Sequence, residues 1–280
     1  MSPKAAERTT HHAPSSPLPR YRGFPFTNPV RLIEVLFTPA EFAALAGRDL
    51  SATTCVVFDV LRATSTMLEA LANGAMAIHP VADIAEALAW KAKSPDVLLA
   101  GERDGLRIHA GLTGGIEFDL GNSPREFTTE RVAGRRIVMT TTNGTRALKA
   151  CAHARTVLVA SFANLAATAD RLLQDAPEHL LLVCSGTGEH TSYEDVLGTG
   201  ALADRIWPLT VGAKIDDAAQ IARNLFRMAE GDLLTAVRHA RNGRRLLDIP
   251  ELAQDVALCL QPDRFGFAAE LGVDGAVRRL

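Results

Sequence analysis

The sequence predicts an α/β fold of three layers, α/β/α, around a mostly parallel or mixed central sheet. From Arg31 onward, short apolar runs rich in β-branched residues alternate with stretches of helical spacing. Alternation of this kind is typical of parallel strands joined by helices that cover both faces of a sheet. With 280 residues, 47% of them hydrophobic, the chain is long enough to bury a sizeable core. We expect residues 30–280 to form this domain, as one body or as two lobes.

Seven apolar runs predict strands, and the run at 53–60 is apolar almost throughout, as in a strand buried on both faces. The predicted strands are 31–37, 53–60, 75–81, 96–102, 135–142, 156–162 and 179–186. Helical spacing predicts helices over 39–47, 63–74, 83–93, 144–152, 164–174 and 193–206. Region 101–134 fits the alternation worst and predicts loops or an antiparallel excursion. After Ile215 we expect a helical C-terminal segment that runs to the end of the chain.

Residues 1–29 predict a flexible N-terminal arm, because they contain six prolines and little apolar periodicity. A segment of this composition cannot bury enough surface to offset its ordering entropy. His11 and His12 could bind a metal, although a solvated tail is the simpler interpretation.

Composition excludes several classes of partner. Lys plus Arg number 30 against 32 for Asp plus Glu, so net charge gives no support for binding to nucleic acid or a membrane surface. No apolar stretch is long enough to span a bilayer, and the N-terminus lacks a signal core. The four cysteines, Cys55, Cys151, Cys184 and Cys259, form no CxxC pair and predict buried, reduced thiols. We therefore expect a cytoplasmic protein, which could self-associate as a homo-oligomer although no interface is visible in the sequence.

Unusual polar residues gather where the predicted strands end. They are Asp59 and Arg62, Glu102 and Arg103, residues 140–145, Ser161 with Asn164, and residues 184–195. Ligands of open α/β sheets bind outside the carboxyl ends of the strands. Five strand ends are therefore expected to meet at one rim and to form a binding site there.

The stretch "VFDVLRATST" (57–66) combines three kinds of ligand-binding group. Asp59 could coordinate a hard cation such as Mg²⁺, and Arg62 has a planar fork suited to phosphate or sulfonate oxygens. The hydroxyl residues 64–66 begin a helix, whose first backbone N–H groups favour an anion. The structural alternative is that Asp59 or Thr64 only caps that helix.

Other strand-end motifs also have structural alternatives. Glu102 and Arg103 could be a weak surface ion pair, and 140–145 could be a tight turn with a hydroxyl cap. Asp119 is placed to fix the loop "DLGNSPRE".

At the start of the last predicted helix, Ser192 and Asp195 could form a capping box, whereas Glu194 and Asp195 could instead serve a metal. The sequence contains no G-x-x-x-x-G-K-[ST] phosphate loop, no zinc-ligand spacing and no G-x-S-x-G nucleophile motif. Leu61 stands where aspartyl-nucleophile phosphatases usually have a second aspartate, so an aspartyl-phosphate route is unsupported.

Taken together, six blocks of the chain resemble the 2-phosphosulfolactate phosphatase family over roughly residues 30–265. The blocks are "VVFDVLRATST", "GERDG", "FDLGNSP", "TTTNGT", "SFANLAA" and "CSGTGEHTSYEDVLGTGAL", in that order. The resemblance implies a Mg²⁺-dependent enzyme with an α/β/α fold and a mixed sheet. Such enzymes remove phosphate from 2-phospho-3-sulfolactate, a step towards coenzyme M in some organisms.

These lines combine into one site hypothesis. Asp59, Arg62 and Arg103 are the candidate catalytic residues, with the two arginines as oxyanion clamps. Asp59 is the first candidate for a metal ligand, and Glu102 and Asp195 are weaker ones. The candidate substrate-binding residues are Arg62, Ser65, Thr66, Arg103, Asn122, Ser123, Thr142, Asn143, Gly144 and Thr145. Arg241, Arg244 and Arg245 could complete the anion site, although a solvated helix face is the simpler interpretation.

Two further functions remain open from the sequence. The substrate could be another small phosphorylated hydroxy acid, or the protein could be a non-catalytic anion-binding module on the same fold. The segment "LRIHAGLTGGIE" (106–117) is longer and richer in glycine than the family pattern, and we expect it to contact the ligand. Whether water or a side chain attacks phosphorus is also open.

Overall fold

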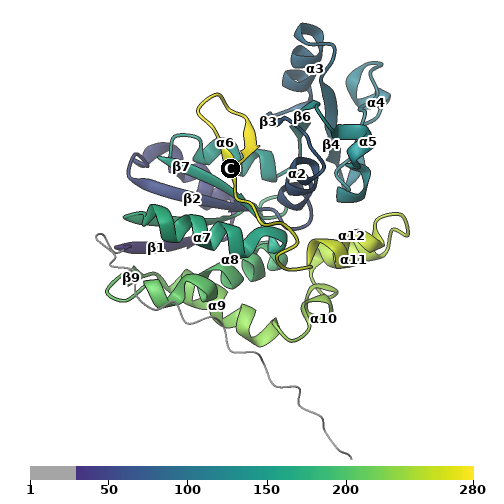
Figure 1. The fold of residues 1–280 in the computed structure, drawn as a ribbon. Helices are drawn as coiled ribbons and strands as arrows, with labels where there is room; N and C mark the ends of the chain where they lie inside the picture. Colours follow the sequence, from purple (N-terminus) through teal and green to yellow (C-terminus); the bar gives the residue numbers. More distant parts are fainter. Residues whose placement is uncertain (1–29) are drawn as a thin grey trace, which may run out of the picture.

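A computed structural model describes residues 30–280, whose strands join in one sheet (Figure 1). The predicted arm 1–29 lies outside the described residues. The sheet order is β5-β4-β6-β3-β11-β10-β7-β2-β8-β1-β9. The strands are β1 (Leu32–Leu36), β2 (Thr53–Phe58), β3 (Ala77–Pro80), β4 (Leu98–Arg103), β5 (Leu106–Arg107), β6 (Arg136–Thr140), β7 (Thr156–Ala160), β8 (His179–Cys184), β9 (Lys214–Ile215), β10 (Ala269–Leu271) and β11 (Val277–Arg279).

Twelve α-helices accompany the sheet within these residues. They are α1 (Pro39–Ala43), α2 (Ala63–Ala72), α3 (Ile84–Lys93), α4 (Ala110–Thr113), α5 (Thr129–Val132), α6 (Gly144–Cys151), α7 (Leu165–Asp175), α8 (Tyr193–Ile206), α9 (Asp217–Ala229), α10 (Leu233–Val237), α11 (Arg241–Leu247) and α12 (Ala253–Cys259). The predicted helices and the seven predicted strands are thus confirmed, with boundaries shifted by a few residues. The fold class, α/β/α with a mixed sheet, is confirmed as well.

The sheet consists of two parallel blocks that a C-terminal hairpin joins. Strands β4, β6 and β3 are parallel to one another, and so are β7, β2, β8, β1 and β9. Between the blocks, β10 and β11 pair antiparallel to each other, to β7 and to β3. Three successive antiparallel pairings mean that the two blocks run in opposite directions. The hairpin, yellow in Figure 1, therefore turns two parallel sheets into one mixed sheet.

This hairpin corrects the prediction of an entirely helical C-terminus. Each of its strands has only three residues, and the turn between them includes Gly272 and Gly275. A strand of three residues is too short to show the alternation of apolar and polar residues that identifies strands in a sequence. Its outer hydrogen-bonding partners are β7 and β3, which lie far away in the sequence. The two-residue strand β9 was missed for the same reason. In contrast, the predicted antiparallel excursion in 101–134 is confirmed by the β4–β5 pair.

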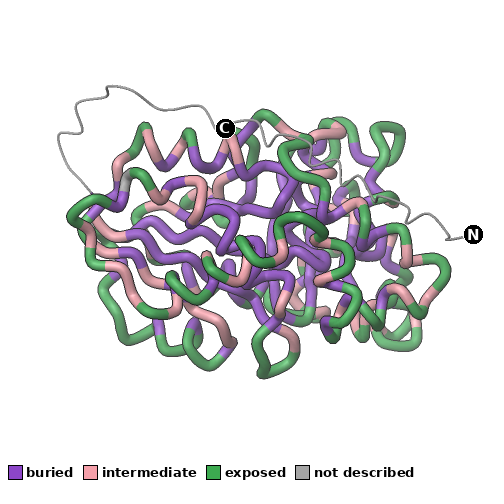
Figure 2. The backbone as a smooth tube through the Cα atoms, turned by 90° about the horizontal axis from the view of Figure 1, so that it is seen from below, coloured by how far each residue is buried: buried purple, intermediate pink, exposed green. Residues whose placement is uncertain are grey.

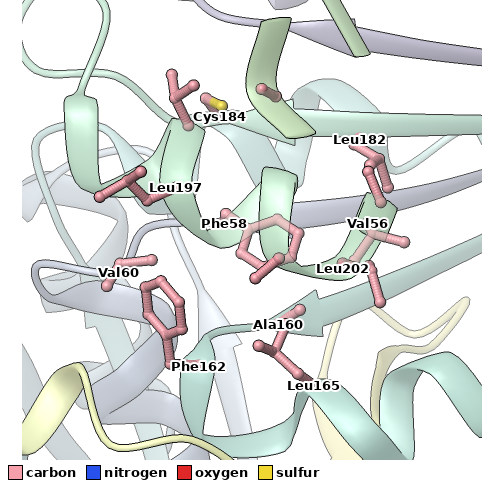
Figure 3. Close-up of a cluster of buried hydrophobic side chains, with 14 of the residues drawn as sticks. Val56, Phe58, Val60, Ala160, Phe162, Leu165, Leu182, Cys184, Leu197 and Leu202 are labelled. Carbon is pink, nitrogen blue, oxygen red and sulfur yellow. The ribbon is translucent and has the colours of Figure 1, made fainter. Parts of the chain in front are cut away.

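Side chains of the central strands alternate between two hydrophobic clusters. Val56 and Phe58 of β2 pack in the cluster beneath α7, α8 and α9 (Figure 3), whereas Cys55 and Val57 pack against α2 and α6 on the other face. This alternation follows from the period of two along a strand. Figure 2 shows the strands as a continuous buried layer between partly exposed helices.

The four cysteines are free and buried, as predicted. None of the helices in the described part of the chain combines the length and the apolar character needed to cross a membrane.

Candidate active site

A pocket of about 410 Å³ is lined by residues at the carboxyl ends of strands from both parallel blocks. It has two sides, which differ in burial. The inner wall, as we call it, consists of buried residues at or just beyond the ends of strands: Asp59, Arg62, Glu102, Asn122 and Asn143. The outer wall consists of Arg241, Asn242 and Arg245 of α11, and the loop 186–190 connects the two walls. Of the five strand ends expected at one rim, those of β2, β4, β6 and β8 line the pocket, whereas Ser161 after β7 caps a short 3₁₀ turn.

Asp59 follows β2, and one of its carboxylate oxygens holds the start of the next helix. Its Oδ1 accepts the N–H of Ala63 at 3.0 Å, so it does cap the start of α2. The other oxygen, Oδ2, lies beside Gly144, where a Cβ would come within 2.5 Å of it. A hydrogen bond from Ser185 to this carboxylate acts to lower the pKa of Asp59. The capping and ligand-binding interpretations of Asp59 are therefore compatible.

The Asp59 carboxylate lies in a buried and negatively charged environment. Burial raises the pKa of Asp59 to about 6, the Ala63 N–H partly offsets this, and the charge of Glu102 raises the pKa further. An oxyanion or a cation that enters the pocket thus meets a carboxylate whose charge the protein neutralises only weakly.

Asp195, at the start of α8, connects that helix to the corner after β2. Its Oδ1 accepts the N–H of Val60 at 2.8 Å, and its Oδ2 accepts from the Ser185 hydroxyl and the Gly186 N–H. Burial, with the nearby charge of Asp59, raises the pKa of Asp195 well above its usual value. Asp195 therefore stabilises the contact between α8 and the corner after β2, and it does not line the pocket.

The alternative of a capping box at 192–195 is wrong. Ser192 makes no side-chain cap hydrogen bond, and its buried Oγ has no partner in the described chain. In a capping box, the Asp195 side chain would accept the backbone N–H of Ser192. Here it accepts the N–H of Val60 instead.

Arg62 is held on the inner wall by a buried aspartate from the C-terminal region. Asp255, on α12, accepts from Arg62 Nη1 at 2.8 Å, and both side chains are almost fully buried. The same carboxylate accepts from the Ser123 hydroxyl and from Arg125 Nε, each at 2.8 Å, while Arg62 Nη2 donates to the Gly105 carbonyl. Charge-assisted hydrogen bonds of this kind fix the direction of the guanidinium plane. No pattern in the sequence pointed to Asp255, which lies 193 residues from Arg62.

Glu102 holds the two loops at the far side of the inner wall. Its Oε1 accepts the N–H and hydroxyl of Thr142, and its Oε2 accepts the N–H of Gly105. Within residues 30–280, Glu102 and Asp195 do not form a metal-ligating group with Asp59. The oxygens of Glu102 and Asp195 accept backbone N–H groups of the loops and corner around the site. Of the three candidates, Asp59 and Glu102 line the pocket and Asp195 does not.

The structure corrects the predicted role of Arg103. Its guanidinium donates to the carbonyl of Glu102 and to Thr140, and it does not line the pocket. The alternative of a Glu102–Arg103 ion pair is wrong too, because both side chains bind other groups. Arg103 stabilises the ends of β4 and β6, which carry two loops of the inner wall.

Six of the predicted site residues line the pocket and the others support it from behind. Those in the lining are Asp59, Arg62, Glu102, Asn122, Thr142 and Asn143. Those outside it are Ser65, Thr66, Arg103, Ser123, Gly144, Thr145 and Asp195. The hydroxyls of the second set mostly bind carbonyls or side chains of the scaffold, as Ser65 binds Val60 and Thr66 binds Asn122.

Two amides of the inner wall differ in their partners. Asn143 donates to the carbonyls of Ser185 and Gly188 and accepts the Gly188 N–H, so it holds the loop after β8. Asn122 is 5% exposed, and its Oδ1 has no hydrogen-bond partner among the described residues. Because a buried carbonyl oxygen without a donor is costly, Asn122 Oδ1 is suited to a ligand of the pocket.

The segment 106–117 does not contact the pocket, contrary to our expectation. The lining residues that come next to this segment in the chain are Gly105 before it and Asn122 after it. Ile108 instead packs with Phe118 and Leu99 in a separate hydrophobic cluster. The arginines of α11 were noted in the sequence, but only the tertiary structure shows that Arg241 and Arg245 face the site.

The fold and the pocket together define a class of protein: a three-layer α/β protein whose pocket is lined by a carboxylate and several guanidinium groups. The chain belongs to the 2-phosphosulfolactate phosphatase family. The family model described as 2-phosphosulpholactate phosphatase matches residues 42–272. The resemblance found in the sequence is thereby confirmed.

Individual relatives agree with the family. A protein of Caldanaerobacter subterraneus subsp. tengcongensis, named probable 2-phosphosulfolactate phosphatase, is 35% identical over 245 residues, which cover 87% of this chain and 97% of the relative. One of the same name from Gloeobacter violaceus is 41% identical over 210 residues, or 74% of this chain and 84% of the relative. Another, from Thermotoga petrophila, is 38% identical over 212 residues, or 76% and 86% of the two chains.

Proposed function

We propose that the protein is a Mg²⁺-dependent phosphatase that converts 2-phospho-3-sulfolactate and water into 3-sulfolactate and phosphate. The observation that carries the proposal is the inner wall, where the Asp59 carboxylate and the buried guanidinium of Arg62 line one pocket. Family membership and the names of the relatives support the choice of substrate. We also propose a cytoplasmic location, where the four buried thiols would stay reduced.

The residues on the inner wall fit Mg²⁺. This ion prefers oxygen ligands and is often held by one or two carboxylates together with waters and phosphate oxygens. The Asp59 carboxylate lines the pocket, as does Asn122, whose Oδ1 has no hydrogen-bond partner within residues 30–280. Asp59, with Asn122, would hold the ion, which when bound polarises the phosphoryl oxygens and makes a bound water more acidic.

The side chains around the ion would bind and orient the substrate. Arg62 presents its guanidinium from a fixed position, because Asp255 and the Gly105 carbonyl hold two of its nitrogens. A guanidinium fixed in advance stabilises the charge on the phosphoryl oxygens without reorganisation in the transition state. In the net reaction, the oxygen of water becomes bonded to phosphorus, and the bond from phosphorus to the C2 oxygen breaks. That oxygen takes up a proton and leaves as the hydroxyl of 3-sulfolactate.

The test is phosphate release from racemic 2-phospho-3-sulfolactate by the wild type and by Asp59→Asn, each with Mg²⁺ and with EDTA. We expect release by the wild type with Mg²⁺, little with EDTA, and a loss of at least about 100-fold in the variant. Lys93→Gln, at the end of α3 and outside the pocket lining, is the matched control and should retain full activity.

Other outcomes distinguish the alternatives. Release from phospholactate or phosphoglycolate, but not from the sulfonated ester, would keep the chemistry and reject the named substrate. Binding of 3-sulfolactate by a folded wild type that hydrolyses none of these esters would indicate a non-catalytic anion-binding module.

A further inference from the structure

The outer wall of the pocket carries two arginines that no part of the proposed phosphate chemistry uses. Arg241 and Arg245 of α11 both line the pocket, and they are four residues apart. Residues at this spacing lie on the same side of a helix. Arg244, between them in the sequence, does not line the pocket and donates to the His239 carbonyl instead.

Within residues 30–280, neither outer arginine is neutralised by a buried acid. Arg241 Nη1 donates to the Thr187 carbonyl at 3.4 Å. Arg245 donates to the Asp104 carbonyl, and its nearest carboxylate oxygen, 3.8 Å away, belongs to an Asp104 side chain that is 94% exposed. A solvated partner of this kind screens a charge and contributes little. Both guanidinium groups can therefore exchange these contacts for an anion in the pocket.

The helix that carries them is anchored to the connection between β8 and α8 and to the hydrophobic core. Asn242 donates to the Thr187 hydroxyl and to the buried carboxylate of Glu194, each at 2.7 Å. Leu246, on the next turn, is buried against the main hydrophobic cluster. The backbone of α11 is thus fixed by contacts that do not involve the two arginines, so their heads can bind a ligand without disturbing the helix.

The substrate of the proposed function has more than one anionic group to bind. In addition to the phosphate, 2-phospho-3-sulfolactate has a carboxylate and a sulfonate, and the sulfonate is at the carbon furthest from the carboxylate. The inner wall provides one guanidinium, Arg62, for the phosphate end. The planar forks of two arginines suit a tetrahedral oxyanion such as a sulfonate, to which they can donate several hydrogen bonds.

We propose that Arg241 and Arg245 form the sulfonate subsite and thereby set the preference for sulfonated over unsulfonated phosphate esters. This inference rests on the proposed function of the same pocket. The two walls then have different roles. The inner wall binds the phosphate, which reacts, and the outer wall binds the sulfonate, which does not react. Because the sulfonate takes no part in bond breaking, the pair acts on substrate binding, and its loss raises KM more than it lowers kcat.

The experiment compares two substrates that differ only in the sulfonate. Initial rates are measured with 2-phospho-3-sulfolactate and with 2-phospholactate, in which a methyl group replaces the sulfonated carbon. The variants are Arg241→Gln, Arg245→Gln and the double variant, with Arg244→Gln on the same helix as the matched control. Melting temperatures verify the fold, which should persist because the substituted guanidinium groups are on the surface.

For the sulfonated ester, we expect kcat/KM to fall about 10-fold in each single variant and about 100-fold in the double variant. For 2-phospholactate, kcat/KM of the double variant should fall less than about 3-fold. Arg244→Gln should leave kcat/KM unchanged for both substrates. Equal losses on both substrates would overturn the proposal, because the arginines would then act on the phosphate or on the fold. An unchanged double variant would overturn it as well.

A binding measurement separates failure of the subsite from failure of the proposed function. Calorimetric titration with 3-sulfolactate and with lactate requires no turnover. If the wild type hydrolyses neither ester but binds 3-sulfolactate more tightly than lactate, and the double variant loses this difference, the phosphatase function fails and the subsite stands. If the wild type binds both compounds equally, the subsite is rejected whatever the hydrolytic activity.

Discussion

The two walls of the pocket carry the same type of charged side chain in opposite settings. Arg62 on the inner wall is 3% exposed and paired with a fully buried aspartate, whereas Arg245 on the outer wall is 45% exposed and contacts a carbonyl. A buried charge must be paired and hydrogen-bonded, because desolvation costs several kcal/mol otherwise. An exposed arginine has no such requirement. The inner wall is thus rigid at the position where bonds would break, and the outer wall is free to adapt to a ligand.

The largest effect on the inner wall is expected from removing Asp255, the acid that pairs with Arg62. We expect Asp255→Ala to lower the free energy of unfolding by about 3–5 kcal/mol, because Arg62 would remain buried without its counter-charge. Urea denaturation measures this effect. The control is Asp96→Ala, which removes an exposed partner of Arg136 and should cost less than about 1 kcal/mol. Similar costs for the two variants would mean that burial does not distinguish these ion pairs.

Asp59→Asn tests the electrostatic cost of the inner wall. Since burial raises the pKa of Asp59 to about 6 from 3.8, the ionised form destabilises the fold. The penalty is absent below about pH 3.8, grows as the pH rises to about 6, and is complete above it, at about 3 kcal/mol. In EDTA, the variant should therefore be more stable than the wild type by up to this amount at pH 8, and equally stable near pH 4.

Unfolding curves of both proteins across this range of pH measure the difference. Added Mg²⁺ should stabilise the wild type alone, because the variant lacks the proposed ligand. A wild type more stable than Asp59→Asn at pH 8 in EDTA would contradict the prediction.

Gly144→Ala tests how closely the inner wall is packed. The new Cβ would lie 2.5 Å from Asp59 Oδ2 and 2.7 Å from the Ala63 Cβ, so one of them must move. We expect a loss of about 1–3 kcal/mol in stability, and at least about 10-fold lower phosphatase activity. Gly231→Ala, at a position with no neighbouring atom within 4 Å, serves as the control and should change neither quantity appreciably. Full activity in Gly144→Ala would show that Asp59 tolerates displacement.

The smallest effect concerns the first turn of α8, which connects both walls through Glu194 and Asp195. Ser192→Ala should be neutral or should stabilise the protein by up to about 1 kcal/mol, because it removes a buried hydroxyl that has no partner in the described chain. Asp83→Ala removes a true cap, in which Asp83 Oδ1 accepts the Glu86 N–H at 2.8 Å, and should cost about 1 kcal/mol. Thermal denaturation compares the two, and a comparable cost at Ser192 would restore the capping interpretation.

Local sequence patterns were sufficient to predict those features that depend on a single short segment of the chain. The long apolar runs predicted the central strands, and the corner at 57–66 predicted Asp59 and Arg62 as site residues, both of which line the pocket. The error at Arg103 shows the limit of such signals. An arginine beside a glutamate after a strand looks the same in the sequence whether it points into a pocket or back to the carbonyl of Thr140.

By itself, the sequence determined the α/β class, most of the strands and helices, and the family, because each depends on patterns within short stretches. Only the tertiary structure decided how the two parallel blocks are joined, which acid holds Arg62, and which arginines of α11 face the pocket. The hairpin β10–β11 pairs with strands more than 100 residues away, and Asp255 reaches Arg62 across 193 residues. Such long-range pairings depend on how distant segments pack together, and neither segment contains a sequence pattern that identifies the other. The fold alone decides which side chains become neighbours.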